Sequence, residues 1–357
     1  MNSALINSFR DRVNDHSLIL HIYHNYKGKN KWTAICSAMD WIQIGIAGID
    51  KSNLERDNSN SASIKLMTFI SCIDVMWEGI QQLHRIFFDE AGIPFKSKNE
   101  IFQQDMDDNQ YWKEIRAAFA AHPTNLDGHK DGERLFASWS GGGFRNEGDF
   151  CVLIYSNDPN QLEPIFFDIK FDKIYKFAAS RYEYLYTIMD QMGKKAVEWC
   201  EKWKRIQISL SDDVKSNIDI LILENKNRLG NDFYQERLNE IKRAYTVDPS
   251  NSNNMQLIIE YREALSSEIE HITYALQNML LDYEYTLLND SADSQYIYPN
   301  QHIFEPEKGL LDWAVETIKV PLGSYVDFDS YDNLTELQTL VHAGWWKYNE
   351  KRKRPDE

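Results

Sequence analysis

The spacing of hydrophobic residues predicts a chain dominated by helices. In the first 125 residues, apolar side chains recur every three or four positions in four stretches, with polar breaks such as KSNLERDNSNSAS between them. These stretches predict helices over residues 4–24, 31–50, 64–92 and 107–121, with Ser63 or a neighbour as the N-cap of the third. Four helices within this length indicate a compact bundle.

The pattern then changes to short β-branched and aromatic runs. RLFASWS, DFCVLIYS and EPIFFDIKF are separated by turn-forming segments, which predicts a three-stranded antiparallel meander. Helical spacing returns afterwards. We expect further helices over 173–206, from SLSDDVKS to about residue 245, and over 255–288, 308–318 and 333–348. The expected fold is therefore mostly α, with an N-terminal four-helix bundle (1–130), a small antiparallel β-meander (131–172) and a second helical region (173–357).

Charge is distributed unevenly along the chain. The first 125 residues hold 13 Lys and Arg against 15 Asp and Glu, a net of −2, while the remaining 26 against 40 give −14 of the total −16. An acidic surface repels nucleic acid, because phosphate binding depends on Lys and Arg. The near-neutral N-terminal part therefore leaves room for a local anion-binding site. The basic C-terminal run KYNEKRKRPDE is interpreted as a solvated tail, with nuclear targeting or RNA contact as the alternative.

The sequence indicates a cytoplasmic protein. Cys36, Cys72, Cys151 and Cys200 are widely spaced, which favours buried reduced thiols over a disulfide framework or a zinc site. The N-terminus lacks a signal-peptide pattern, and no apolar run is long enough to span a membrane. We expect no metal, no cofactor and no membrane association.

The stretch EIRAAFAAHPTN is the main candidate for chemistry, because it places Arg116 six residues before His122. On an ideal helix the two would lie about 120° apart around the axis and about 9 Å along it. Pro123 disfavours helical geometry at His122, so that side chain is free to turn toward Arg116.

Two interpretations of this pair stay open. In the first, Arg116 binds phosphate through its planar guanidinium and His122 takes a proton from a ribose 2′-hydroxyl, which together would cleave RNA without a metal. Four alanines around the pair allow a substrate to approach closely. In the second, Arg116 forms a structural salt bridge and His122 only caps the last helical carbonyls.

An Arg-x5-His-Pro motif at the end of a late helix in a small bundle resembles the HEPN family (higher eukaryotes and prokaryotes nucleotide-binding domains). The resemblance covers about residues 1–130. It implies a metal-independent endoribonuclease of toxin, defence or RNA-processing systems, dimerising so that two motifs line one cleft, with Arg116 and His122 as the active pair. The family usually has a polar residue after the arginine, whereas this chain has Ala117.

Three other candidates are weaker. Asp74 and Glu78 share a face of the third expected helix and are interpreted either as acid/base or supporting partners of Arg116, or as the one wet stripe of that helix. His16, His21 and His24 lack any accompanying metal motif and are expected at a surface. The glycine-rich GGGFR at 141–145 lacks the Lys-Ser/Thr of a phosphate-binding loop, so a hairpin loop is expected.

The leading hypothesis is a metal-independent endoribonuclease or RNA-binding protein of a bacterial defence or stress system, acting as a homodimer. His122 would be the general base and Arg116 the phosphate and transition-state stabiliser. The alternative, favoured by Ala117 and by the negative charge, is a non-catalytic HEPN-like scaffold for dimerisation or nucleotide sensing. In that case the acidic second half would bind a basic protein partner.

Overall fold

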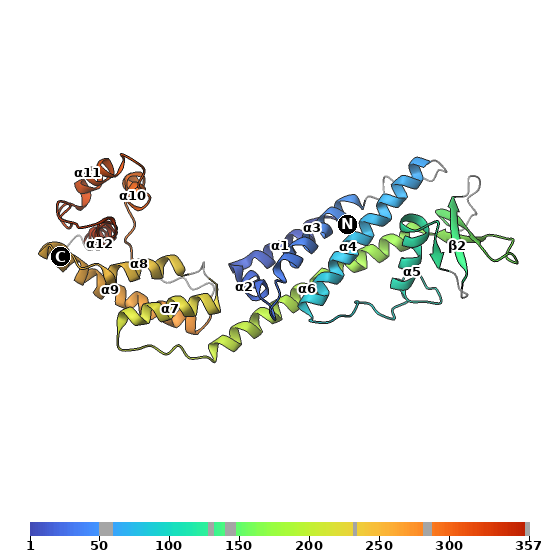
Figure 1. Cartoon of the computed structure of the whole chain (residues 1–357), viewed down its shortest axis with the longest axis horizontal. Helices are drawn as coiled ribbons and strands as arrows, with labels where there is room; N and C mark the ends of the chain where they lie inside the picture. Colours follow the sequence, from blue (N-terminus) through green and yellow to red (C-terminus); the bar gives the residue numbers. More distant parts are fainter. Residues whose placement is uncertain (50–59, 128–131, 140–147, 231–233, 281–287, 354–357) are drawn as a thin grey trace. The chain divides into compact units, whose positions relative to one another are not determined.

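The computed structural model describes residues 1–49, 60–127, 132–139, 148–230, 234–280 and 288–353. Within these ranges the chain is mostly helical, and its strands form one small antiparallel sheet (Figure 1). The chain divides into two compact units, Met1–Val197 (unit 1) and Glu198–Glu357 (unit 2). This division falls inside a helix, whereas the sequence placed its boundaries at residues 130 and 172.

The helices of unit 1 follow the predicted apolar stretches but differ at their ends. They are α1 (Ala4–Asn14), the 3-10 turn η1 (Asp15–Ser17), α2 (Leu18–His24), α3 (Trp32–Gly48), α4 (Asn60–Phe87), α5 (Asp108–Arg116) and the π turn η3 (Ala117–Ala121). The single helix expected over 4–24 is wrong. Ser17 adopts a left-handed φ of 54° inside the polar run NDHS, whose side chains compete with helical hydrogen bonding.

The ends of α4 also differ from expectation. Ser63 lies inside the helix and is not its N-cap. The helix stops at Phe87, before the expected Gly92, because Asp89 takes a left-handed φ of 59°. The apolar residue Phe88 beyond the helix still packs, with its ring stacked 6.4 Å from that of Tyr184. The apolar pattern therefore continues beyond the end of the helix, and for this reason the sequence predicted too long a helix.

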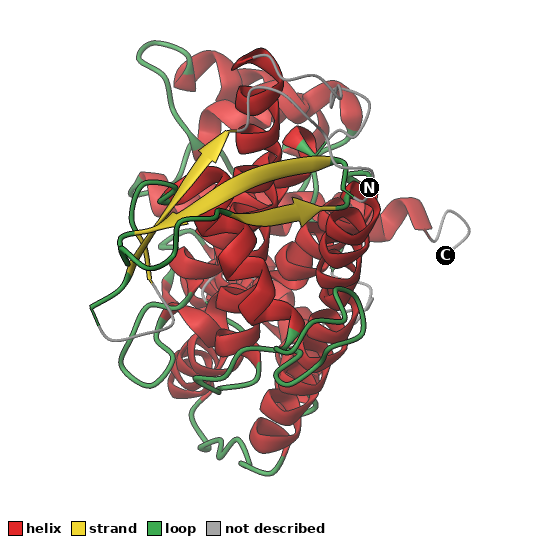
Figure 2. Cartoon of the chain, turned by 90° about the vertical axis from the view of Figure 1, so that its right-hand side faces the viewer, coloured by secondary structure: helices red, strands yellow, loops and turns green. Residues whose placement is uncertain are grey.

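The predicted meander is confirmed in its three main strands. These are β2 (Arg134–Trp139), β3 (Phe150–Ser156) and β4 (Ile165–Ile169), each antiparallel to the next, and a two-residue strand β1 (Leu126–Asp127) extends the edge beside β2. The sheet packs against η3 through aromatic rings, with the ring of Phe119 6.0 Å from that of Trp139 and 5.5 Å from that of Phe167. Figure 2 shows the strands of this sheet as yellow arrows. The sheet thus belongs to unit 1.

Helix α6 (Phe171–Lys204) ties the parts of unit 1 together. Its Phe177 ring stacks on Trp112 of α5 at 4.9 Å, and its Phe171 ring contacts Phe150 of β3 at 5.3 Å. The hydroxyl of Tyr182 accepts a hydrogen bond from the Ile6 amide of α1 at 3.0 Å. The N-terminal helices therefore depend on α6 to cover their apolar faces, which is why a boundary at residue 172 does not separate two cores.

Helices α3 and α4 approach each other closely at two glycines. A Cβ at Gly45 would lie 2.7 Å from the carbonyl oxygen of Cys72 and 2.9 Å from the Cβ of Met76. A Cβ at Gly79 would lie 2.8 Å from the side chain of Ile42. Only glycine fits at such distances, so these two positions fix the spacing between the helices.

Unit 2 is entirely helical in the part of the chain that the structure describes. Its elements are the end of α6, α7 (Val214–Arg228), α8 (Gln235–Thr246), α9 (Ser252–Gln277), the 3-10 turn η4 (Ser294–Tyr296), α10 (Ile297–Phe304), α11 (Leu311–Leu322) and α12 (Leu334–Lys353). The helix expected up to residue 245 is two helices, broken at Gly230 with φ 92°, and α9 ends near Met279 with φ 52°, well before residue 288. Helix α10 lies between residues 288 and 308, where the sequence predicted no helix.

A buried arginine holds the start of unit 2 in place. The fully buried guanidinium of Arg228 donates to the carbonyl oxygens of Trp203 at 2.8 Å and Ile206 at 2.7 Å, and it pairs with Glu224 at 2.5 Å. Trp203 lies in the last turn of α6, and Ile206 lies two residues beyond its end. Arg228 therefore caps that helix end.

Candidate functional site

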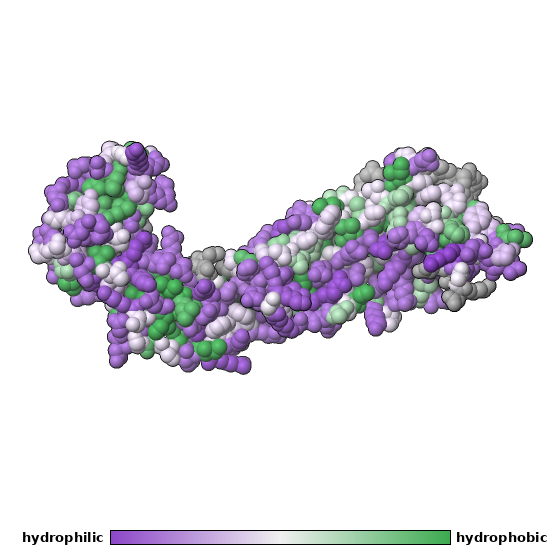
Figure 3. Space-filling view, in the orientation of Figure 1, coloured by the Kyte–Doolittle hydropathy of each residue, from purple (hydrophilic) through white to green (hydrophobic). Residues whose placement is uncertain are grey.

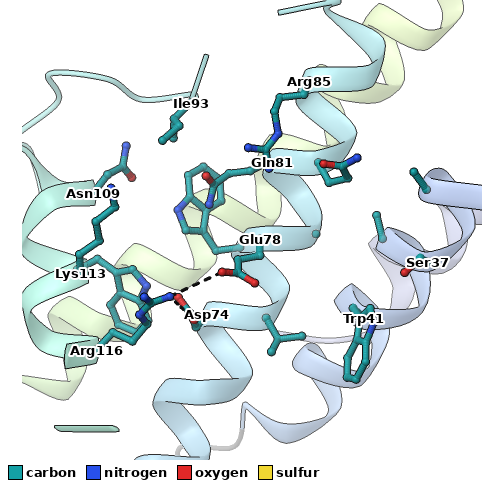
Figure 4. A pocket seen from close by; sticks show the side chains of 17 residues that line it. Ser37, Trp41, Asp74, Glu78, Gln81, Arg85, Ile93, Asn109, Lys113 and Arg116 are labelled. Atoms are coloured by element: carbon teal, nitrogen blue, oxygen red, sulfur yellow. Dashed lines mark hydrogen bonds and ion pairs between the residues drawn. The ribbon is translucent and has the colours of Figure 1, made fainter. Parts of the chain in front are cut away.

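A cleft of about 800 Å³ opens between α3, α4 and α5 of unit 1 (Figure 4). Helix α4 forms its floor and presents a polar stripe at helical spacing. The lining side chains of this stripe are Asp74, Glu78, Gln81 and Arg85. Helix α5 contributes Asn109, Lys113 and Arg116 from one wall, and α3 contributes Ser37 and Trp41 from the other. Each helix repeats at three to four residues, so one face of each turns toward the same space.

Arg116 is committed to the carboxylates of α4. Its Nη1 donates to Oδ2 of Asp74 at 2.9 Å and lies 3.7 Å from Oε1 of Glu78. The side chains of Arg116 and Asp74 are 33% and 19% exposed, so the pair is half-buried and still reachable from the cleft. The structure thus brings together three of the residues singled out in the sequence. Asp74 and Glu78 also belong to the polar, solvent-facing stripe of α4. The positions of these two carboxylates therefore agree with both interpretations, as partners of Arg116 and as the polar face of the helix.

The other two cations of the cleft are unpaired. Neither the guanidinium of Arg85 nor the ammonium of Lys113 forms a hydrogen bond or ion pair with any residue in the described ranges. The Nε atoms of Arg85 and Arg116 and the indole Nε1 of Trp112 are buried without an acceptor. Among the lining residues, three cations against two carboxylates give a net charge of +1. The cleft is therefore locally positive in a chain of net −16, and two of its cations are available to a ligand.

A further positive charge lies directly behind the cleft. Arg181 of α6 is 1% exposed, and no carboxylate of the described chain lies within ion-pair distance of it. Its Nη2 donates to Oδ1 of Asn109 at 3.1 Å, and its guanidinium lies 4.0 Å from the centre of the Phe177 ring. Burial lowers the pKa of Arg181 to about 10, with Asp108 opposing that shift, so it stays charged at neutral pH. Its field adds to the attraction of the cleft for anions.

Two aspartates position the wall formed by α5. Asp107 caps the helix by accepting from the amides of Asn109 at 2.9 Å and Gln110 at 3.0 Å. The buried carboxylate of Asp108 accepts from the amides of Glu100 at 3.0 Å and Phe102 at 2.9 Å. These bonds order the segment before α5 and thereby fix where Lys113 and Arg116 stand.

His122 does not line the cleft. After Arg116 the chain forms the π turn η3, and the His122 amide donates to the Ala117 carbonyl at 3.1 Å, one residue further back than in an α-helix. His122 then leaves the helix with φ −139° and ψ 44°, as the following proline predicts. Its side chain is exposed and forms no hydrogen bond or ion pair within the ranges that the structure describes. The expected last turn of α-helix is wrong, and the two motif residues face different surroundings.

Within the described residues, the remaining sequence candidates form no recognisable site. No group of three or more His, Cys, Asp or Glu in the described ranges is arranged to hold a metal ion, and His21 and His24 are half-buried and exposed. The GGGFR segment lies outside the described residues. All four cysteines are free thiols, but only Cys151 is buried, so the expectation of four buried thiols is wrong. No helix in the described ranges has the length and apolarity needed to cross a membrane.

Sequence reasoning missed Arg85, Lys113, Trp41 and Arg181. Arg85 and Lys113 could have been predicted from the sequence, since each lies at helical spacing from an expected site residue. Arg85 follows Glu78 by two turns on α4, and Lys113 precedes Arg116 by one turn on α5. Trp41 and Arg181 join the site only through the packing of α3 and α6.

Comparison with protein-family models, with curated proteins and with solved structures returned no match.

Proposed function

We propose that the cleft of unit 1 binds single-stranded RNA through its phosphates. The observation that carries this proposal is that Arg85 and Lys113 have no hydrogen-bond or ion-pair partner in the described chain, while Arg116 beside them lies in the same cleft and is paired with Asp74. Phosphate oxygens supply acceptors and negative charge together. The field of Arg181 supports the same choice of ligand.

The position of Trp41 favours RNA over a small inorganic anion as the ligand of the cleft. Its side chain is 52% exposed at the wall opposite Lys113 and Arg116, where an unpaired base could stack on it (Figure 4). Stacking on an exposed aromatic ring contributes about 1–3 kcal/mol per base and needs no particular sequence. Duplex RNA does not offer its bases in this way.

Fluorescence anisotropy with a labelled single-stranded RNA tests the proposal. We expect the double variant Arg85→Ala/Lys113→Ala to lower the affinity roughly tenfold or more at low salt. It should also reduce the slope of log K against log salt by about 1.4, at about 0.7 per lost phosphate contact. The double variant Lys29→Ala/Lys96→Ala removes the same charge from exposed lysines outside the cleft and is the matched control. Equal weakening in both double variants would show that net charge alone, and not the cleft, binds RNA.

RNA cleavage is the second candidate function, and it is favoured by the exposed and unpartnered side chain of His122. His122 would accept the proton of a ribose 2′-hydroxyl, while Arg116 would stabilise the charge that develops on the phosphate. Since His122 lies outside the cleft lining, the RNA would have to pass from Arg116 over η3. A homodimer would supply a second motif to the same strand.

Cleavage of mixed-sequence RNA in EDTA by wild type and His122→Ala tests this second function. Cutting by wild type but not by the variant supports catalysis. Equal cutting by both identifies a contaminating nuclease, and the absence of cutting together with RNA binding leaves a binding protein. If RNA neither binds nor is cut, the non-catalytic scaffold becomes the better account.

A further inference from the structure

Unit 2 carries an exposed apolar surface on α10 and α11, which we call the α10–α11 patch and define as Tyr298, Trp313 and Val320. Their side chains are 61%, 43% and 79% exposed. Trp313 and Val320 lie two turns apart on one face of α11, and the ring of Tyr298 lies 5.9 Å from that of Trp313. Apolar residues stand among hydrophilic ones over these helices (Figure 3). Large apolar side chains gathered on one surface mark a contact site more often than single ones do.

A buried histidine lies beneath the two rings of this patch. His302 is 4% exposed, and its ring lies 4.6 Å from that of Tyr298 at 90° and 6.2 Å from that of Trp313. Neither of its ring nitrogens has a hydrogen-bond partner. A buried polar group without a partner is destabilising, so it needs an explanation. The chain itself leaves this group unsatisfied directly under an exposed aromatic pair.

Several carboxylates lie close to the patch along the chain. Asp312 and Glu316 lie on α11, and Glu305 and Glu307 lie in the segment before it. All four are exposed, and none forms an ion pair with a residue in the described ranges. Unit 2 as a whole has 17 Lys and Arg against 29 Asp and Glu, a net charge of −12. Of the two nearby lysines, Lys308 and Lys319, the second is paired with Asp329 at 2.8 Å. The rim of the patch is therefore negative.

We propose that the α10–α11 patch is the docking surface for a basic amphipathic helix of a partner protein. Apolar side chains of that helix would pack on Tyr298, Trp313 and Val320, and its Lys and Arg residues would pair with the surrounding carboxylates. The charge of the rim argues against the other ligands of such a surface, because RNA and acidic peptides are both repelled by it. This proposal is independent of RNA binding by unit 1.

Fluorescence anisotropy with a labelled peptide of Leu and Lys at amphipathic helical spacing tests the proposal on the full chain. We expect saturable binding of this peptide and none of the matched peptide in which Glu replaces Lys. Trp313→Ala and Glu316→Lys should each weaken binding by roughly tenfold, since central aromatic anchors and close charge pairs dominate such interfaces. Circular dichroism of each variant checks the fold, which substitution of these exposed side chains should preserve.

The control variants are Tyr186→Ala, an exposed tyrosine of unit 1, and Glu163→Lys, an exposed glutamate outside unit 2 that gives the same change of net charge. Neither should affect binding of the Leu/Lys peptide. The proposal is overturned if that peptide fails to bind, if the Leu/Glu peptide binds equally well, or if the controls weaken binding as much as the patch variants. It is also overturned if sedimentation shows that the chain self-associates and that Glu316→Lys disperses the oligomer, since the patch would then be occupied by a second copy.

Discussion

At the scale of single residues, the ion pair of Arg116 decides how the cleft can act. A half-buried arginine that is already bonded to Asp74 offers a phosphate only part of its charge, since the carboxylate competes with the ligand. Arg85 and Lys113 have no such competitor in the described chain. We therefore assign the first contact with RNA to these two residues and a supporting position to Arg116.

Removal of the competing carboxylate should strengthen RNA binding. We expect Asp74→Asn to raise the affinity several-fold at low salt, because it removes a negative charge from the cleft and frees Nη1 of Arg116. The cost in stability should be small, about 0.5–1 kcal/mol, as for other half-exposed ion pairs. Asp40→Asn, which breaks the ion pair with Arg10 at 3.0 Å elsewhere in unit 1, is the matched control for anisotropy and should leave RNA affinity unchanged. A fall in affinity with Asp74→Asn would show that this carboxylate positions Arg116 for the ligand.

At the scale of elements, the close approach of α3 and α4 sets the width of the cleft. We expect Gly45→Ala to destabilise unit 1 by about 1–3 kcal/mol, because the added Cβ meets backbone oxygen at 2.7 Å and neither helix can yield without moving the other. Urea unfolding measures the loss. Gly92→Ala is the control, since its Cβ would meet only the flexible carboxylate of Glu90 at 3.7 Å. Similar stability of both variants would mean that the two helices are free to separate.

The sequence predicted elements well where the signal is local. Apolar spacing located the helices of unit 1 and the three main strands, because helical and strand periodicities are visible within one segment. It failed at Ser17, Asp89, Gly230 and Met279, where a single left-handed residue ends or breaks a helix while apolar residues continue beyond it. It also failed at η3, since nothing in AAFAA distinguishes a π turn from an α turn.

The candidate site was predictable only in part for a related reason. Arg116, Asp74 and Glu78 could be selected by type and spacing, and the structure places them in contact. Trp41 and Arg181 reach the same cleft through the tertiary packing of α3 and α6. No sequence pattern within either helix indicates that packing. The separation of His122 from the cleft depends on the π turn and was equally invisible.

At the scale of the whole molecule, unit 2 has its own hydrophobic core and its own buried charge cluster. Arg237 of α8 pairs with Glu268 at 2.6 Å and with Asp290 at 2.6 Å, and Asp290 also accepts from the hydroxyl of Tyr261 at 2.5 Å. His342 of α12 lies beside this cluster, with its Nδ1 3.6 Å from Asp290. The cluster joins α8, α9 and α12 around charged groups that are mostly shielded from water.

Stability of unit 2 should fall in mildly acidic solution. Burial lowers the pKa of His342, and the nearby Asp290 and Glu240 only partly oppose this, while Arg237 and Arg243 add to it. The unfolded chain therefore binds the proton first, at about pH 6.5, so stability is full above that pH and is lost as the pH falls from there toward the lowered pKa of the folded state. We expect His342→Gln to flatten the pH dependence of urea unfolding in this window, whereas His24→Gln at an exposed position should not. An unchanged profile in His342→Gln would assign the acid sensitivity to other groups.

Photocrosslinking would show most directly whether bound RNA lies in the cleft between α3, α4 and α5. A thiouridine-substituted single-stranded RNA would be irradiated with the full chain in EDTA, and the crosslinked peptides would be identified by mass spectrometry. We expect crosslinks on the peptides that carry Trp41 and Lys113, and we expect them to be lost when Arg85 and Lys113 are replaced by alanine. Crosslinks confined to unit 2 or to the sheet, or unaffected by those substitutions, would contradict it.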